Sequence, residues 1–241
     1  MENNPLRDKH ILITGSSRGI GASIARIAKG YGAEVILHGK TESEELKIVA
    51  SELNAKYIFC DTGNETEVKM AMKTISKVDI LINNAGISLS KSLKESKTEE
   101  WLATYNTNIM GIVNFSKEVI PKMELGIGKI INIASIKGLA SSTGRPAFAS
   151  SKAGVIALTA SMAKELGPNI LVNCVAPGFT ETETTKKDWS ERIYKQIDQT
   201  ILKRAAKPEE IAEVVLFLAS NKSNYITGQT IIVDGGYSIS L

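Results

Sequence analysis

A four-residue spacing between Phe148 and Lys152 is the feature of this sequence that bears most directly on chemistry. Side chains four positions apart share one face of a helix. A tyrosine at position 148 would lie beside the Lys152 ammonium, which favours the phenolate and lowers the phenol pKa from about 10. Such a pair supplies a proton donor near neutral pH. Phe148 has the shape of that donor and lacks its hydroxyl.

A glycine-rich turn near the N-terminus predicts a dinucleotide site. The segment 14–21, Thr-Gly-Ser-Ser-Arg-Gly-Ile-Gly, follows an apolar run and begins a helical pattern. Its glycines permit a tight turn and close approach to a pyrophosphate, which then lies at the positive N-terminus of the helix. The spacing alone is weak, because other strand-to-helix turns also use glycine. The predicted cofactor residues of this turn are Gly15, Ser17, Arg18, Gly19, Ile20 and Gly21.

Together these two segments resemble the short-chain dehydrogenase/reductase family. The similarity extends from about His10 to Gly236 and is greatest to the branch of 3-oxoacyl-carrier-protein reductases. The family signature has a tyrosine, three further residues and a lysine. Here Lys152 is kept and Phe148 takes the tyrosine position. The resemblance implies hydride transfer between a nicotinamide and a carbonyl or secondary alcohol.

Three further segments resemble the nucleotide site of that family, each at the carboxyl end of a predicted strand, where open α/β sheets bind ligands. The first resembles the pair beside the adenine, the second a motif that supports the sheet edge and lines the ribose, and the third the segment that fixes the nicotinamide amide. The resemblance therefore implies cofactor contacts by Asp61, Thr62, Asn83, Ala85, Gly86, Lys152, Pro177, Gly178, Thr180 and Thr182.

The residues after the second predicted strand favour NADPH over NADH. An acidic residue there would accept from a free 2′-hydroxyl and repel a 2′-phosphate. The sequence instead has Lys40 in this position, and Arg18 lies in the glycine-rich turn. Two cations and no carboxylate at those positions suit a 2′-phosphate, so the expected cofactor is NADP(H). The alternative is that Lys40 simply faces solvent.

The resemblance also assigns roles around the reacting carbonyl, where hydride addition leaves a developing alkoxide that needs donors and then a proton. Ser135 would hydrogen-bond the substrate oxygen, Lys152 would hold the nicotinamide ribose, and Asn108 would anchor a water chain to that lysine. A positioned general acid contributes about 10²- to 10⁴-fold in rate. Phe148 therefore predicts weak turnover with cofactor binding left intact.

No other side chain is an obvious substitute for the missing acid. The tyrosines at 105, 194 and 225 lie in other elements, and Ser150 and Ser151 precede Lys152 too closely to face the same way. Three explanations stay open. The chain is an engineered Tyr-to-Phe variant of an active reductase, or a natural NADPH-binding sensor, subunit or scaffold without turnover, or an enzyme whose proton comes from water or substrate, with Ser135 alone stabilising the alkoxide.

Short apolar runs alternate with helical patterns along the whole chain, which predicts one α/β domain over residues 1–241 with a doubly wound parallel sheet of Rossmann type. The family topology gives the order 3-2-1-4-5-6-7. The predicted strands are His10–Thr14, Glu34–His38, Lys56–Cys60, Asp79–Asn83, Lys129–Ala134, Ile170–Val175 and Thr230–Asp234. The clearest predicted helices are Thr98–Val119, Ala147–Leu166 and Pro208–Leu218, and Thr41 with Glu44 predicts a capping box.

The least regular stretch, segment 179–206, is polar and is typical of an insertion that covers or binds a substrate. Its charges alternate in sign, which favours a solvated face over an anion site. The charged residues are Lys186, Lys187, Arg192 and Lys195, interleaved with Glu183, Asp188 and Glu191. A carrier-protein reductase should have basic residues just before the fifth strand, whereas residues 123–128 read Met-Glu-Leu-Gly-Ile-Gly. The substrate is thus predicted only as a carbonyl or secondary alcohol.

Composition excludes several classes of function. A net charge of +3 over 241 residues, without a basic tract, argues against nucleic-acid binding. No apolar run approaches a signal core or a membrane span, so a cytoplasmic location is expected. With two histidines, His10 and His38, a metal site is not expected, and Cys60 and Cys174 are expected to be buried thiols. The resemblance implies a homotetramer.

Overall fold

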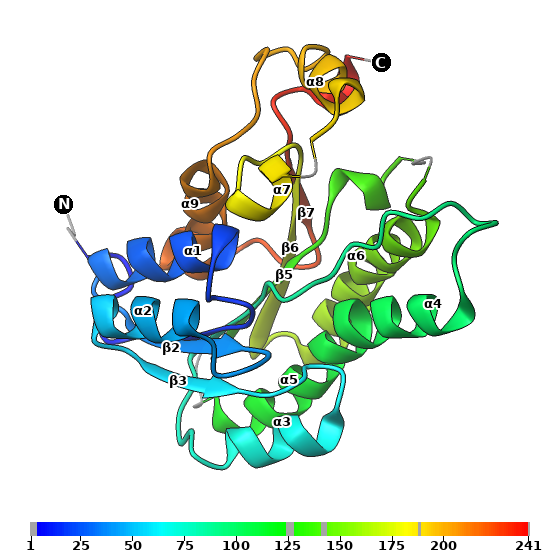
Figure 1. Cartoon of the computed structure of the whole chain (residues 1–241). Helices are drawn as coiled ribbons and strands as arrows, with labels where there is room; N and C mark the ends of the chain where they lie inside the picture. The colour runs from blue at the N-terminus through cyan, green and yellow to red at the C-terminus, as the bar shows by residue number, and fades with distance from the viewer. Residues whose placement is uncertain (1–3, 124–127, 141–143, 188, 241) are drawn as a thin grey trace.

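Seven short apolar runs form one parallel sheet in the order β3-β2-β1-β4-β5-β6-β7, as predicted. The computed structural model describes residues 4–123, 128–140, 144–187 and 189–240 (Figure 1). The strands are β1 (His10–Ile13), β2 (Glu34–Gly39), β3 (Lys56–Phe59), β4 (Ile80–Asn83), β5 (Gly128–Ile133), β6 (Ile170–Pro177) and β7 (Thr230–Val233). All seven predicted strands are confirmed, with ends displaced by one or two residues.

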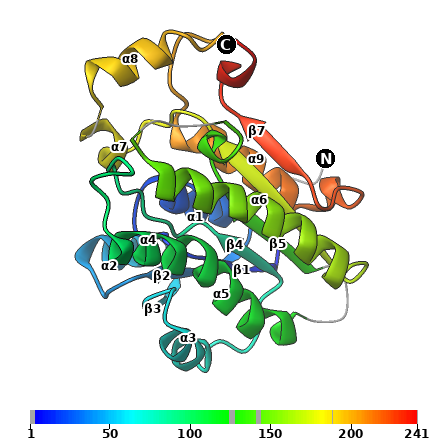
Figure 2. The same cartoon turned by 90° about the vertical axis from the view of Figure 1, so that its right-hand side faces the viewer.

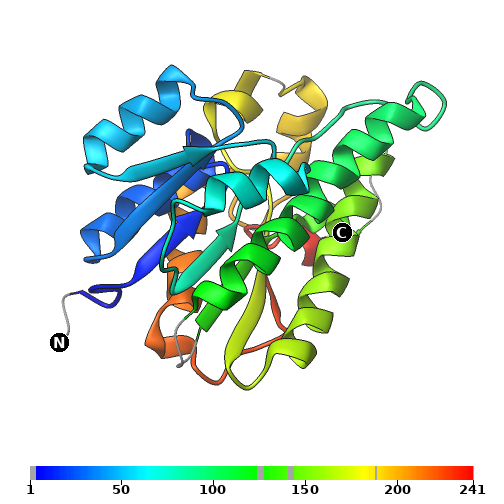
Figure 3. The same ribbon diagram turned by 90° about the horizontal axis from the view of Figure 1, so that it is seen from below.

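Helices cover both faces of the sheet because successive strand residues point to opposite sides. In β1, Ile11 and Ile13 pack in one core cluster, whereas Leu12 packs in the other. The first cluster lies under α1 (Gly19–Gly30), α2 (Glu44–Leu53) and α9 (Pro208–Ala219). The opposite face carries α3 (Glu65–Met72), α4 (Thr98–Tyr105), α5 (Gly111–Val119) and α6 (Pro146–Leu166) (Figures 2 and 3). The carboxyl ends of all strands therefore meet at one edge.

Two helix predictions need correction. The predicted helix Thr98–Val119 is divided, because a π turn at Asn106–Met110 separates α4 from α5. Such turns accommodate an extra residue and are frequent at functional sites. The predicted capping box of Thr41 with Glu44 is wrong. The chain still turns here, with Ser43 N donating to Thr41 O, and the Ser43 hydroxyl caps α2 by accepting from Leu46 N.

Segment 179–206 is more regular than its sequence indicates, since it contains the short helices α7 (Glu183–Lys187) and α8 (Glu191–Ile197). Its two ends are held together, with Ala206 N donating to Phe179 O and Glu181 N to Ala206 O, both at 2.8 Å. The segment lies at the same end of the molecule as the C-terminal turn (Figure 1), and Leu202 N donates to Gly235 O there. It thus stands over the carboxyl ends of β6 and β7.

The expectations drawn from composition concern the cysteines, metal sites and membrane-spanning helices. Cys60 and Cys174 are both buried and unpaired, as predicted. Across residues 4–123, 128–140, 144–187 and 189–240, no cluster of His, Cys, Asp or Glu side chains is arranged to hold a metal ion. Within the same ranges, no helix has both the length and the apolar composition needed to cross a membrane. Residues 124–127 belong to the segment where a carrier-protein reductase should have basic residues, and they lie outside the described part.

Candidate nucleotide and catalytic site

The turn after β1 has a backbone that depends on glycine. Gly15 and Gly19 adopt φ values of +64° and +58°, in the left-handed region that other residues rarely occupy. A Cβ at Gly21 would lie 2.3 Å from Gly15 O, so the turn folds tightly onto the first turn of α1. Arg18, exposed and directly before α1, marks the open side of this cradle. Backbone N–H groups at such a helix start suit a phosphate group.

Asn84 and Thr14 fasten this turn to the end of β4. Thr14 Oγ1 accepts from Asn84 N and Ala85 N, both at 3.0 Å. Asn84 Nδ2 donates to the carbonyl oxygens of Thr14 and Gly15 at 3.0 and 2.9 Å. A Cβ on Gly15 would meet Ala85 Cα at 2.9 Å, so the two segments touch through backbone. The tetrapeptide 83–86 therefore positions the glycine-rich turn directly.

Asn83, predicted to contact the cofactor, is hydrogen-bonded within the sheet. Its side chain is buried, and Nδ2 donates to Asn132 Oδ1 at 2.9 Å. Asn132 Nδ2 donates in turn to Thr159 Oγ1 on α6. Asn84, which the sequence reasoning passed over, is the residue of this pair that acts on the turn.

His38 positions the glycine-rich turn, a contact that sequence reasoning missed. Its ring lies fully buried at the end of β2. Nδ1 accepts from Gly15 N at 3.2 Å, and Nε2 lies 3.1 Å from Cys60 O, which fixes the proton on Nε2. Burial lowers the pKa of His38 to about 4, so the ring is neutral at pH 7. One imidazole on β2 thus links the segments that follow β1 and β3.

Lys40 and Asp61 form an ion pair across the ends of β2 and β3, with Nζ and Oδ2 2.7 Å apart. The hydrogen bond from Lys40 holds the pKa of Asp61 below its usual range. The sequence indicated no carboxylate beside Lys40, because the two residues are far apart along the chain. The Lys40 side chain nevertheless remains 73% exposed. Asp61 Oδ1 also accepts from Gly63 N, which orients the carboxylate.

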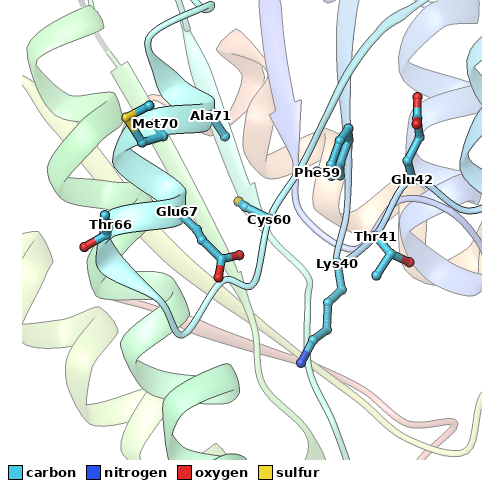
Figure 4. A pocket seen from close by; sticks show the side chains of 9 residues that line it. All are labelled: Lys40, Thr41, Glu42, Phe59, Cys60, Thr66, Glu67, Met70 and Ala71. Carbon is cyan, nitrogen blue, oxygen red and sulfur yellow. The ribbon is translucent and has the colours of Figure 1, made fainter.

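A hollow of about 510 Å³ adjoins this ion pair on the outer side of β3 (Figure 4). Phe59 and Met70 give it exposed apolar walls, and Lys40 and Glu67 line it as charged groups. Three strands separate β3 from β5, so the hollow flanks the predicted adenosine end of the site and not the region of Ser135. The full lining comprises Lys40, Thr41, Glu42, Phe59, Cys60, Thr66, Glu67, Met70 and Ala71.

Phe148 and Lys152 share one face of α6, as their spacing predicts. Lys152 Nζ lies 5.8 Å from the centroid of the Phe148 ring and donates to Ile133 O at 2.7 Å. The Lys152 side chain is buried, and that burial lowers its pKa to about 8. The carbonyl at the end of β5 therefore fixes the ammonium beside the Phe148 ring.

The loop after β5 carries Ser135 and packs closely on α6. At Gly138 of this loop there is no room for a side chain. Ser135 caps a 3₁₀ turn (Ile136–Gly138), with its Oγ accepting from Lys137 N at 3.2 Å. A Cβ on Gly138 would lie 2.6 Å from Lys152 C and 2.7 Å from Ala153 N. This close approach holds the Ser135 turn directly on the helix that carries Lys152.

Asn108 lies in the π turn, and both the oxygen and the nitrogen of its side-chain amide are hydrogen-bonded. Its Oδ1 accepts from Ile87 N at 2.8 Å, and its Nδ2 donates to Ile87 O and to Ser151 Oγ. A Cβ built on Gly86 would lie 3.3 Å from Asn108 Oδ1 and 3.4 Å from Lys152 Nζ. Asn108 and Lys152 thus flank the same glycine. Ser151 Oγ donates to Phe148 O at 2.8 Å, so this hydroxyl is bonded within α6.

The segment after β6 reaches back to the glycine-rich turn. A Cβ on Gly178 would meet Asp234 Cα at 2.7 Å, so the strand ends of β6 and β7 are packed backbone to backbone. Thr182 N donates to Thr185 Oγ1, which itself donates to Thr180 O. A Cβ on Gly19 would lie 3.4 Å from Thr182 Cγ2. The two predicted ends of the cofactor site therefore approach each other across the edge of the sheet.

Comparison with known proteins identifies this arrangement. A family model described as enoyl-(acyl carrier protein) reductase matches residues 15–238. The 3-oxoacyl-[acyl-carrier-protein] reductase FabG of Thermotoga maritima is 39% identical over 97% of this chain and 99% of its own. The chain belongs to the short-chain dehydrogenase/reductase family. FabG of Vibrio cholerae is also similar, with 40% identity over 96% of this chain and 98% of its own.

Two of the solved structures that are similar to this short-chain dehydrogenase/reductase are named as dehydrogenases of a sugar acid or a sugar. A gluconate 5-dehydrogenase of Burkholderia cenocepacia, in complex with NADP and tartrate, superposes with a TM-score of 0.93 at 29% identity and covers 99% of each chain. The aldohexose dehydrogenase of Thermoplasma acidophilum gives 0.89 at 32% identity, covering 98% of this chain and 96% of its own. The chain is therefore an oxidoreductase by family.

The buried His38 gives this short-chain dehydrogenase/reductase a defined response to acid. Because the folded pKa of about 4 lies below the unfolded value of 6.5, the unfolded chain takes up the proton first. The stability gained from a neutral His38 is complete above about pH 6.5 and is lost as the pH falls toward 4. Between pH 7 and pH 5 this group should cost about 2 kcal/mol of unfolding free energy.

Urea denaturation of the chain and of His38→Gln at these two pH values checks this. The glutamine does not titrate, so the variant should lose about 2 kcal/mol less than the parent chain on acidification. His10→Gln is the matched control, because it removes the other imidazole and leaves His38 in place, and it should keep the loss that His38 causes. An equal loss in the parent and in His38→Gln would contradict the assignment.

Proposed function

We propose that the protein is an NADP(H)-dependent oxidoreductase that transfers hydride between the nicotinamide and a carbonyl or secondary alcohol, with its proton-donor position occupied by Phe148. The observation that carries this proposal is the Lys152 ammonium, buried and fixed at Ile133 O, 5.8 Å from the Phe148 ring. Ser135 and Asn108 are held against the same helix. A binding protein with no catalytic ancestry would not need this combination.

The chemistry divides between what the cofactor supplies and what these residues do. When bound, NADPH supplies the hydride that adds to the carbonyl carbon. The Ser135 hydroxyl donates to the carbonyl oxygen and stabilises the alkoxide that develops there. Lys152 holds the ribose and adds positive charge near that oxygen. A proton must then reach the alkoxide, and Phe148 has none to give, so it comes from water or from an acidic group of the substrate.

The cofactor assignment draws support from the cradle at Gly15, Gly19 and Gly21 and from the cations at its rim. Arg18 is exposed before α1, and Lys40 is largely exposed although it pairs with Asp61. A 2′-phosphate beside Lys40 would be bound by a charge already on the surface. Two similar solved structures, both from Burkholderia cenocepacia, are complexes with NADP.

The first test restores the phenol. Phe148→Tyr should oxidise NADPH with 3-oxoacyl thioesters or activated diketones about 10²- to 10⁴-fold faster than the parent chain, because it regains a general acid beside Lys152. Stopped-flow absorbance at the NADPH band measures both rates. Phe217→Tyr is the matched control, because it adds the same hydroxyl on α9, away from Lys152, and it should leave the rate unchanged.

The competing function is NADPH binding without turnover, as a sensor or scaffold, and the absence of any hydroxyl at position 148 favours it. If Phe148→Tyr is silent while both proteins bind NADPH, this second function gains. If the parent already turns over as fast as the variant, the role given to position 148 is wrong.

Cofactor preference gives a separate prediction. At equal ionic strength the chain should bind NADPH more tightly than NADH, and Lys40→Ala should weaken NADPH binding by about tenfold, the effect of one charge-assisted contact. Cofactor fluorescence measures both dissociation constants. Lys47→Ala, an exposed lysine paired with Glu44, is the control and should bind as the parent does. Equal affinity for NADH and NADPH would overturn the preference.

We also propose the homotetramer that the family resemblance implies. Apolar side chains stand exposed on the helix and strand surfaces that such an assembly would cover, among them Leu102, Met110, Phe217 and Ile232. Ile232 lies on β7, an edge strand of the sheet. Light scattering coupled to gel filtration should give four times the 26.0 kDa chain mass, and a monomer at micromolar concentration would refute the proposal.

A further inference from the structure

The Lys137 ammonium is held beside two aromatic rings at the edge of the catalytic loop. Its Nζ lies 5.5 Å from the centroid of Phe179 and 5.6 Å from that of Tyr237. The two rings pack edge to face, 5.1 Å apart, so they form a preformed corner. A cation over aromatic faces is attracted to them. This side chain is therefore positioned, and it does not simply extend into solvent.

Positive charges gather around this corner without an acidic partner for Lys137. Burial, followed by the guanidinium groups of Arg145 and Arg192, lowers the pKa of Lys137. Within the described ranges, neither Lys137 nor Arg145 has a carboxylate at ion-pair distance. Half-buried cations in proteins are usually paired. Holding like charges together costs stability, which points to a use for them.

Lys137 and Arg145 lie close along the chain to the predicted catalytic residues. Lys137 follows Ser135 by two residues, and its backbone N donates to Ser135 Oγ. Arg145 directly precedes α6, the helix of Phe148 and Lys152. Arg145 Nη1 also lies 3.4 Å from Ser88 Oγ, in the loop after β4. The connection from β5 to α6 and the loop after β4 thus carry these donors at the same edge of the sheet as Ser135.

We propose that Lys137 and Arg145, with the Ser88 hydroxyl, bind a carboxylate of the substrate, so that the protein prefers small oxo acids or hydroxy acids to neutral carbonyls and thioesters. This inference rests on the proposed function and narrows its substrate class. The planar fork of an arginine matches a carboxylate, and an ammonium and a hydroxyl add donors to it. The carboxylate would give Lys137 and Arg145 the acidic partner that neither has at ion-pair distance within the described ranges.

Two basic residues of segment 179–206 differ from Lys137 and Arg145 because they have carboxylate partners. Lys186 pairs with Glu181 at 2.5 Å and Lys195 with Glu191 at 3.0 Å, all four largely exposed. These pairs agree with the solvated face that the alternating charges predict. Arg192 is the member of that set whose charge acts on Lys137. The Lys187 side chain and Asp188 lie outside the described part.

The test is equilibrium binding, which does not depend on turnover. The NADPH-loaded chain is titrated by calorimetry with 2-oxobutanoate, 3-oxobutanoate and 3-oxohexanoate, and with their methyl esters. At least one acid should bind ten times more tightly than its ester, because only the acid carries the charge. Lys137→Met should remove that difference, and Lys195→Met, a change in an exposed and paired lysine, should retain it.

Arg145→Gln gives a second reading that does not alter the Lys137 corner, and it should reduce the preference for the acid in the same direction. NADPH affinity confirms that each variant is folded. If no acid binds more tightly than its ester, or if Lys137→Met keeps the full preference, the carboxylate site is overturned.

Failure of the proposed function is distinguishable from failure of this site. If Phe148→Tyr is inactive on every substrate while acid binding still depends on Lys137, the carboxylate site stands and the reductase assignment fails. If Phe148→Tyr reduces the esters with the same kcat/KM as the acids, the reductase assignment stands and the carboxylate site fails.

Discussion

Close backbone packing at the carboxyl edge of the sheet is the constraint on which the site depends. At Gly15 against Ala85, and at Gly138 against Lys152, a single added Cβ would lie within 3 Å of backbone atoms. These contacts are too close to relieve by rotating a side chain, so the loops are located by the chain itself. Ser135, the glycine-rich turn and α6 are consequently parts of one rigid frame, and the polar side chains are placed by that frame.

The polar groups at the centre of this frame are buried, and burial lowers their pKa values. His38 is neutral and Lys152 keeps its ammonium at pH 7, and each is hydrogen-bonded to a backbone partner, Gly15 N or Ile133 O. Burying such groups costs free energy unless they are hydrogen-bonded. Positioning these polar groups therefore lowers the free energy of unfolding unless hydrogen bonds offset the cost. This explains why the polar network of the site includes residues, such as His38, that the family signature does not name.

The sequence predicted the sheet well because apolar runs separated by helical periods have few other ways to be buried. It predicted the Phe148–Lys152 geometry because a helix fixes that spacing locally. The division of the helix 98–119 was not predictable, since it depends on Asn108 bonding to Ile87 across a loop. The Lys40–Asp61 pair and the Lys137–Arg145 cluster were missed for the same reason: each joins segments from different elements, and no local pattern records such contacts.

The closure of segment 179–206 on itself has a mechanical consequence. Its ends meet at Phe179 and Ala206, and Leu202 N donates to Gly235 O, so the segment is fastened both to itself and to the C-terminal turn. The Phe179 ring packs on Tyr237 of that turn, and the two rings form the walls of the Lys137 corner. A displacement of the C-terminal turn would therefore reach segment 179–206 and the Lys137 ammonium together.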